Sequence, residues 1–192
     1  MNKHEIEYRN AESEISSSSD EGLKVKGYAV VFNVPTLLYE SDGIKYYEQV
    51  DKNALTNADM KNVVFRYNHN DDFQVLARTS NNTLTLNVDG KGLYIEADLA
   101  PTTAGKDIYE LIKRKDVNKL SYAYVVETAH YEKKSNNEYV RIIDSIKKVV
   151  DVSAVDFPAY HQTDLDVVKR SFENVVNEVE QKRKQIELKS KL

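Results

Sequence analysis

The chain of 192 residues contains no cysteine and no tryptophan, and it has only three prolines. The absence of cysteine excludes a disulfide scaffold, a thiolate nucleophile and a cysteine-ligated metal, and it fits a protein of the cytosol. No apolar run approaches the length that spans a bilayer, and the polar N-terminus lacks the apolar segment of a secretory signal. The formal net charge is −4, so no overall basic field favours nucleic acid. We therefore expect neither a membrane nor a nucleic acid as a partner.

Strand-like segments fill most of the chain. Hydrophobic residues make up 41 % and charged residues 30 %, as in globular proteins, and the thirteen tyrosines suit half-buried strands. Strands joined by turns as short as DGKG and SNNE favour antiparallel pairing over βαβ units. The sequence predicts a mainly β (α+β) fold, an antiparallel β-barrel of about seven strands with flanking helices. The strand-like segments are LKVKGYAVVFN, IKYYEQV, VVFRYNH, QVLARTS, LTLNVD, LYIEADL, LSYAYVVETAHY and EYVRIIDSIKKVVDVSAVDF.

Two segments have helical patterns. Residues 102–116 place Ile108, Leu111 and Ile112 on one face, with an acidic residue early and basic residues late. Residues 164–192 contain no glycine or proline and carry apolar residues at near-helical spacing, which predicts a C-terminal amphipathic helix. The apolar seam of this helix is narrow, so it must dock on the rest of the chain or on a partner.

These patterns divide the chain into three parts. Residues 1–22 are polar and serine-rich, which predicts a flexible N-terminal arm or a poorly specified first strand. Residues 23–163 form the predicted folded domain, and residues 164–192 form a helical extension.

Two residues stand where a nucleophile and its base could lie. His69 follows a strand in VVFRYNHNDD, at the rim of the predicted fold, where a general base is both held and accessible. Ser121 begins the strand SYAYVV, and as a nucleophile it needs a base to take its proton and a third group to orient the imidazole. Each also has a structural reading, His69 as a surface turn histidine and Ser121 as a donor to a neighbouring carbonyl. The downstream groups that could be the third member are Asp144, Asp151, Asp156 and His161.

Two other patterns suggest different chemistry. His69, Asp71 and Asp72 in NHNDD are spaced as in a metal-binding loop. No second histidine–carboxylate cluster accompanies them at recognisable spacing, so neither a metal nor a cofactor is expected. The basic run KRKQIELKSK follows acidic residues in EVEQKRK, and this mixture of signs favours a contact with protein over one with nucleic acid.

Several motifs in order resemble those of the prohead serine proteases of tailed bacteriophages, whose fold is similar to that of the herpesvirus maturation protease, assemblin. Any one motif is weak, but the resemblance runs from about Leu23 to Thr163. The motifs are GYAVVFN, YEQVDKNAL, YNHN, the stretch from LARTS to LSYAY, and DVSAVDFPAYHQT. Ala77, Lys115 and Ala123 stand where glycine is usual in the family, and we expect Lys115 to change the turn before the strand of Ser121.

The resemblance implies a serine endopeptidase in which His69 is the general base, Ser121 the nucleophile and Asp151 the third member. Asp156 is the alternative third member, although the family has threonine there. His161 is a more remote alternative, because the herpesvirus relatives use a histidine. Asp151 and Asp156 are five positions apart, so on a regular strand they face opposite sides and only one can reach His69.

The resemblance also implies a biological role. The expected substrates are the scaffolding segment of the major capsid protein and then the protease itself, inside the immature procapsid in the host cytoplasm. Residues 164–192 would be a docking or self-cleavage region, and a homodimer is an expectation taken from the herpesvirus relatives. The competing hypothesis is a non-enzymatic scaffold or interaction protein of capsid assembly, which predicts that His69, Ser121 and Asp151 lie far apart.

Overall fold

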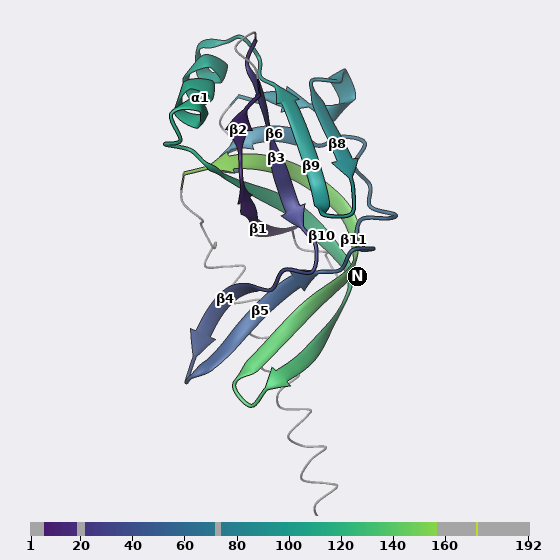
Figure 1. Ribbon diagram of the computed structural model, residues 1–192. Coiled ribbons are helices and arrows are strands. Elements are labelled where there is room, and N and C mark those ends of the chain that lie inside the picture. Colours follow the sequence, from purple (N-terminus) through teal and green to yellow (C-terminus); the bar gives the residue numbers. More distant parts are fainter. Residues whose placement is uncertain (1–5, 19–21, 72–73, 157–171, 173–192) are drawn as a thin grey trace, which may run out of the picture. The chain divides into compact units, whose positions relative to one another are not determined.

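The computed structural model describes residues 6–18, 22–71, 74–156 and 172 (Figure 1). By its contacts the chain divides into two units, residues 1–159 and 160–192, and every element described below belongs to the first.

Seven strands form the first sheet. Five of them follow the order β1-β10-β11-β5-β4, and β6 pairs with another part of β11 and with β7. The long strand β11 pairs antiparallel with β10 along one edge. Along its other edge it pairs in parallel with β5 near its beginning and with β6 near its end, so the sheet branches there. The strands are β1 (Ile6–Glu14), β4 (Thr36–Ser41), β5 (Ile44–Val50), β6 (Val64–Tyr67), β7 (Ala77–Arg78), β10 (Lys119–Ser135) and β11 (Glu138–Val155).

The second sheet is antiparallel, in the order β2-β3-β9-β8, and helix α1 (Thr103–Lys113) contacts its strands β2 and β3. The strands are β2 (Ser16–Ser17), β3 (Lys24–Val31), β8 (Leu84–Val88) and β9 (Gly92–Asp98), and a short 3₁₀ helix, η1 (Thr79–Asn81), precedes β8. One apolar core joins the two sheets, because buried side chains of both belong to a single cluster. This cluster includes Val25, Leu93 and Ile95 from the second sheet, and Leu120, Tyr122, Val152 and Ala154 from the first.

The mainly β character predicted from the sequence is confirmed, but the antiparallel barrel is wrong. Among the described residues the strands form two sheets rather than a closed barrel, the larger sheet is mixed, and the strands number eleven. The physical reason lies in β11, which has 18 residues and is longer than either of the strands along its second edge. This edge therefore pairs in parallel with both β5 and β6. Parallel pairs need long crossovers, which the short turns of the sequence did not suggest.

The N-terminal segment is a strand over most of its described length. Ile6–Glu14 pairs with β10, so a flexible arm is the wrong interpretation for these residues, and the alternative of a first strand describes them. The helix predicted at residues 102–116 forms as α1. The helix predicted at residues 164–192 lies outside the described residues, and the three-part division of the chain stays a prediction.

The end of α1 delivers the chain into β10. The main-chain N–H of Lys115 donates to the carbonyl of Ile112, and that of Asp116 donates to the carbonyl of Leu111, which is the hydrogen-bond pattern of a Schellman cap. Lys115 itself adopts the left-handed conformation, with φ 69°. The lysine therefore takes the backbone shape that glycine adopts most readily at such a cap, at some steric expense.

Candidate active site

His69 lies on a turn that is anchored to β11. Because β6 runs parallel to β11, with Val64 opposite Asp151, its end meets the end of β11. The chain then reverses through Asn68 and His69, whose φ values of 51° and 52° are left-handed, and the N–H of Asn68 donates to the carbonyl of Ala154. Left-handed backbone is unfavourable for histidine, so the surrounding contacts must hold this turn.

Ser121 lies on the middle strand of three and has neighbours on both sides. It is directly opposite Asn10 of β1 and Ser153 of β11. Residues opposite each other in antiparallel strands share a face, and Asp151, two residues before Ser153, shares it too. The intervening Tyr122 and Val152 belong to the apolar core, so the polar row faces away from that core.

The imidazole of His69 connects Ser121 to Asp151. Its Nδ1 lies 2.6 Å from Asp151 Oδ1, and its Nε2 lies 2.6 Å from Ser121 Oγ. Ser121 is 2 % exposed and Asp151 is 6 % exposed, so water screens these interactions weakly. Distances of this size are typical of charge-assisted hydrogen bonds, and the order carboxylate–imidazole–hydroxyl is the arrangement that activates a serine.

Strand β1 completes the surroundings of this group. The Ser121 hydroxyl donates to the main-chain carbonyl of Arg9, 2.9 Å away. The ring of Tyr8 packs edge-on against the imidazole of His69, with 4.8 Å between ring centroids. Both contacts come from the N-terminal segment, so the site depends on a strand that begins more than a hundred residues before the serine.

A protein-family model described as Caudovirus prohead serine protease matches residues 7–178 of the chain. The chain belongs to this family. It is accordingly a phage prohead protease, which acts in capsid maturation. No significant match to a curated protein or to a solved structure was found, so the expected likeness to the herpesvirus protease fold stays a prediction.

The other candidates for the third position have different partners in this prohead protease. The Tyr67 hydroxyl donates to Asp156 Oδ2, 2.9 Å away. Asp144 lies 2.8 Å from Nδ1 of His130, on the outer part of the β10–β11 pair. His161 lies outside the described residues. The competing hypothesis of a non-enzymatic scaffold is wrong in its geometric prediction, since His69 contacts both Ser121 and Asp151.

The metal-loop interpretation of NHNDD does not fit the geometry. Both ring nitrogens of His69 are engaged by Asp151 and Ser121, and Asp71 pairs with Arg66 at 2.6 Å with its side chain 91 % exposed. Asp72 lies outside the described residues. Among the residues that are described, no group of three or more histidine and acidic side chains is gathered as a metal site would require.

Within the same part of the chain, no helix has the length and apolar character to cross a membrane.

Sequence reasoning missed a buried ionic cluster behind the site. Arg9 Nε donates to Glu48 Oε1 at 2.7 Å, Arg141 Nη1 donates to Glu7 Oε2 at 2.6 Å and to Glu48 Oε2 at 2.9 Å, and the Tyr124 hydroxyl donates to Glu48 Oε1 at 2.8 Å. Burial alone would raise the pKa of Glu48, but the charges of Arg9 and Arg141 outweigh it and lower that pKa. The cluster ties β1 to β5, β10 and β11. No local sequence pattern predicts the cluster, because Glu48, Tyr124 and Arg141 are far in the sequence from Glu7 and Arg9.

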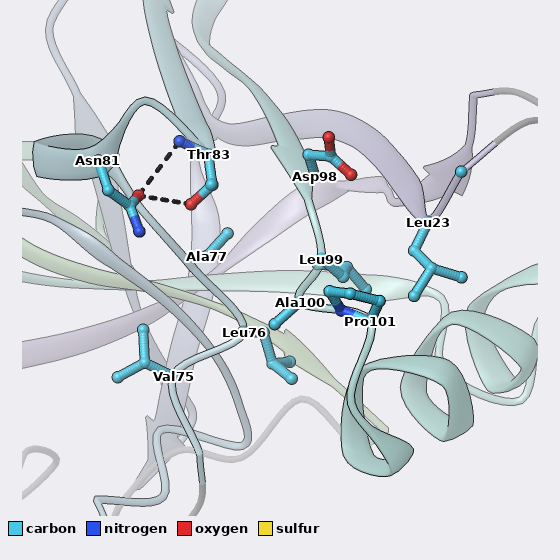
Figure 2. Close-up of a pocket in the computed structure, with 11 residues that line it drawn as sticks. Leu23, Val75, Leu76, Ala77, Asn81, Thr83, Asp98, Leu99, Ala100 and Pro101 are labelled. Carbon is cyan, nitrogen blue, oxygen red and sulfur yellow. Dashed lines mark hydrogen bonds between the residues drawn. The ribbon is translucent and has the colours of Figure 1, made fainter.

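An apolar hollow of about 390 Å³ lies elsewhere in the first unit (Figure 2). Figure 2 shows Leu76, Leu99 and Pro101 at its wall, with Asn81 bonded to Thr83 at its edge. None of His69, Ser121 and Asp151 lines it. The hollow is therefore separate from the hydrogen-bonded group of the candidate active site.

Proposed function

We propose that His69, Ser121 and Asp151 form a catalytic triad with which this prohead protease hydrolyses peptide bonds through an acyl-enzyme. One observation carries the proposal: the two hydrogen bonds that join Asp151 Oδ1 to His69 Nδ1 and His69 Nε2 to Ser121 Oγ, each 2.6 Å long. A buried carboxylate at Nδ1 holds the imidazole with its proton on that nitrogen, which leaves Nε2 free to accept the serine proton.

The chemistry then runs in two stages. His69 Nε2 takes the proton of Ser121 as Oγ bonds to the substrate carbonyl carbon, and the imidazolium gives that proton to the leaving amine as the carbon–nitrogen bond breaks. Water then attacks the ester carbon as the same imidazole takes its proton, and the imidazolium returns that proton to Ser121 Oγ as the ester bond to the serine breaks. Asp151 stabilises the imidazolium in both stages without taking its proton.

The Arg9 carbonyl contributes to the resting position of the nucleophile. The Ser121 hydroxyl has one proton and two acceptors within reach, His69 Nε2 and the Arg9 carbonyl oxygen. We propose that the proton bonds to Nε2 when a substrate is attacked, and that Arg9 holds the hydroxyl rotamer before this step. Ser121 is 2 % exposed, so the atoms that shield it from solvent must move before a peptide reaches Oγ.

The proposed substrates follow from the family. A prohead protease of a tailed phage works inside the immature capsid, and we propose that this chain removes the scaffolding segment of the major capsid protein and then cleaves itself. Residues 164–192 are the proposed docking or self-cleavage region, and the proposed assembly is a homodimer. A variant ending at residue 165 that is still packaged and active would contradict the docking role.

Co-expression with the major capsid protein of the same phage tests the activity. We expect cleavage with the wild-type protease, and a loss of about 10⁴–10⁶-fold in rate with Ser121→Ala or His69→Ala, read by intact mass. Ser145→Ala is the matched control, because Ser145 lies on β11 and bonds to Thr128, outside the triad. Cleavage by Ser121→Ala at the wild-type rate would refute the proposed mechanism.

A further inference from the structure

We propose that Ser153 is a positioning residue that locks the imidazole-bearing turn to the carboxylate of Asp151. The inference rests on the proposed triad, since a positioning role has meaning only if His69 and Asp151 act together. Ser153 lies on β11 directly opposite Ser121, is fully buried at 0 % exposure, and touches both other members of the triad.

The directions of its two hydrogen bonds are set by chemistry. The main-chain N–H of His69 donates to Ser153 Oγ at 3.1 Å, so the serine oxygen is the acceptor in that bond. The single hydroxyl proton is then available to donate to Asp151 Oδ1, also at 3.1 Å. Asp151 Oδ1 therefore accepts two hydrogen bonds, one from the imidazole Nδ1–H and one from Ser153.

The turn needs this anchor because its backbone is strained. His69 has φ 52°, in the left-handed region that most residues with a Cβ avoid, and its neighbour Asn68 has φ 51°. Without the Ser153 hydroxyl, the main-chain N–H of His69 would lose its acceptor on β11 and Asp151 Oδ1 would lose a donor, so the turn that carries the imidazole would be held less firmly over Ser121. A displacement of about 1 Å at a catalytic group lowers rates by about a hundredfold.

Among the described residues, the groups that contact the imidazole come from three strands. Asp151 approaches it from β11, Tyr8 packs against it from β1, and Ser121 contacts it from β10. Within the turn, Arg66 pairs with Asp71, and the Arg66 Nη1 donates to the carbonyl of Asn70. Removal of the Ser153 hydroxyl changes none of these charges. It removes one donor from Asp151, whose carboxylate then attracts the imidazolium proton more strongly.

The test uses the full chain and a fluorophosphonate probe, which needs no knowledge of the cleavage site. Ser121 Oγ forms a bond to phosphorus, fluoride leaves, and the serine proton passes to His69. Intact mass gives the second-order labelling rate constant across pH for the wild type, Ser153→Ala, Ser153→Cys and the control Ser145→Ala. Thermal unfolding of each variant separates loss of reactivity from loss of fold.

With Ser153→Ala we expect labelling about 10–100-fold slower and an acid limb of the pH–rate profile moved to higher pH. Ser153→Cys keeps the geometry of the side chain but replaces oxygen with a larger sulfur that is only a weak donor and acceptor, so it should fold and still label more slowly. Ser145→Ala should behave as the wild type.

A folded Ser153→Ala that labels within twofold of the wild type, with the same acid limb, would overturn the inference. If Ser153→Ala does not fold, wild-type labelling by a folded Ser153→Cys would overturn it in the same way. Ser121→Ala, measured in parallel, separates failure of the proposed triad from failure of the positioning role. Continued labelling of Ser121→Ala refutes the triad. Normal labelling of the Ser153 variants alone refutes only the positioning role.

Discussion

The hydroxyl oxygen of Ser121 lies 2.9 Å from the main-chain carbonyl oxygen of Arg9, although 112 positions separate the two residues. The same strand that brings this carbonyl to the serine carries the Arg9 guanidinium on its opposite face, bonded to Glu48. The ionic cluster on the core side therefore holds in place the backbone that contacts Ser121. Changes in the cluster should act on the whole fold.

Replacement of Glu48 by glutamine should strongly destabilise the protein. Glu48 accepts hydrogen bonds from Arg9, Arg141 and Tyr124 and is 3 % exposed. Its loss leaves two buried guanidinium groups facing the single carboxylate of Glu7, and breaking such a buried pair costs about 3–5 kcal/mol. Urea unfolding at pH 7 measures the change. The control Glu40→Gln alters an exposed strand carboxylate and should change stability by less than about 0.5 kcal/mol.

The same carboxylate should make stability sensitive to acid. The pKa of Glu48 is lowered in the folded protein, because Arg9 and Arg141 outweigh the effect of burial. A lowered pKa contributes stability that is fully present above the unfolded value near 4.5 and is lost as the pH falls through the folded value. Urea midpoints between pH 6 and about pH 2 should therefore fall more steeply for the wild type than for Glu48→Gln. Equal slopes would contradict this account.

Asparagine substitutions should separate the two candidate aspartates. Asp151→Asn keeps the shape of the side chain but removes the charge that stabilises the imidazolium, so we expect proteolysis about 10³–10⁴-fold slower. Asp156→Asn changes a group bonded to Tyr67 and should leave the rate within a few-fold of the wild type. Capsid-protein cleavage followed by intact mass provides the measurement. The reverse ranking would assign the third position to Asp156.

Lys115→Gly should stabilise the protein. Lys115 has φ 69°, and glycine reaches this conformation without the steric penalty of a Cβ. Part of that gain is offset by the greater freedom of glycine in the unfolded chain, so we expect a net increase of about 0.5–1 kcal/mol in the free energy of unfolding. Lys113→Gly, two residues earlier within α1, should instead lose about 1 kcal/mol. Thermal unfolding of both variants tests the opposite signs.

Gly27→Ala should destabilise the contact between the two sheets. A Cβ at Gly27 would lie 2.7 Å from the Glu14 carbonyl oxygen and 2.9 Å from Leu120 Cδ1, and main-chain atoms cannot easily move away. Overpacking of this kind costs about 1–3 kcal/mol. Gly90→Ala is the control, because a Cβ there meets nothing within 4 Å. If both variants have the same urea midpoint, the close approach at Gly27 is not a constraint.

Several parts of the fold could be predicted because their signals are local. The apolar periodicity of residues 102–116 predicts α1, and the turn signals predict most strand boundaries. The order of strands could not be predicted in this way. The parallel pairs of β11 with β5 and β6 join segments that are distant in the chain, and no local pattern records which edge meets which.

In the candidate site, too, features with local sequence signals could be predicted, and contacts between distant segments could not. The motifs around His69, Ser121 and Asp151 occur in order along the chain, and this order predicts both the family and the three residues of the site. Three contacts follow only from the folded chain: Asp151 rather than Asp156 contacts the imidazole, Ser153 bonds both Asp151 and the main-chain N–H of His69, and the Arg9 carbonyl reaches Ser121. Charged residues in a polar segment normally indicate exposure. Glu7 and Arg9 are buried because partners from β5 and β11 neutralise them, and such compensation exists only once the chain has folded.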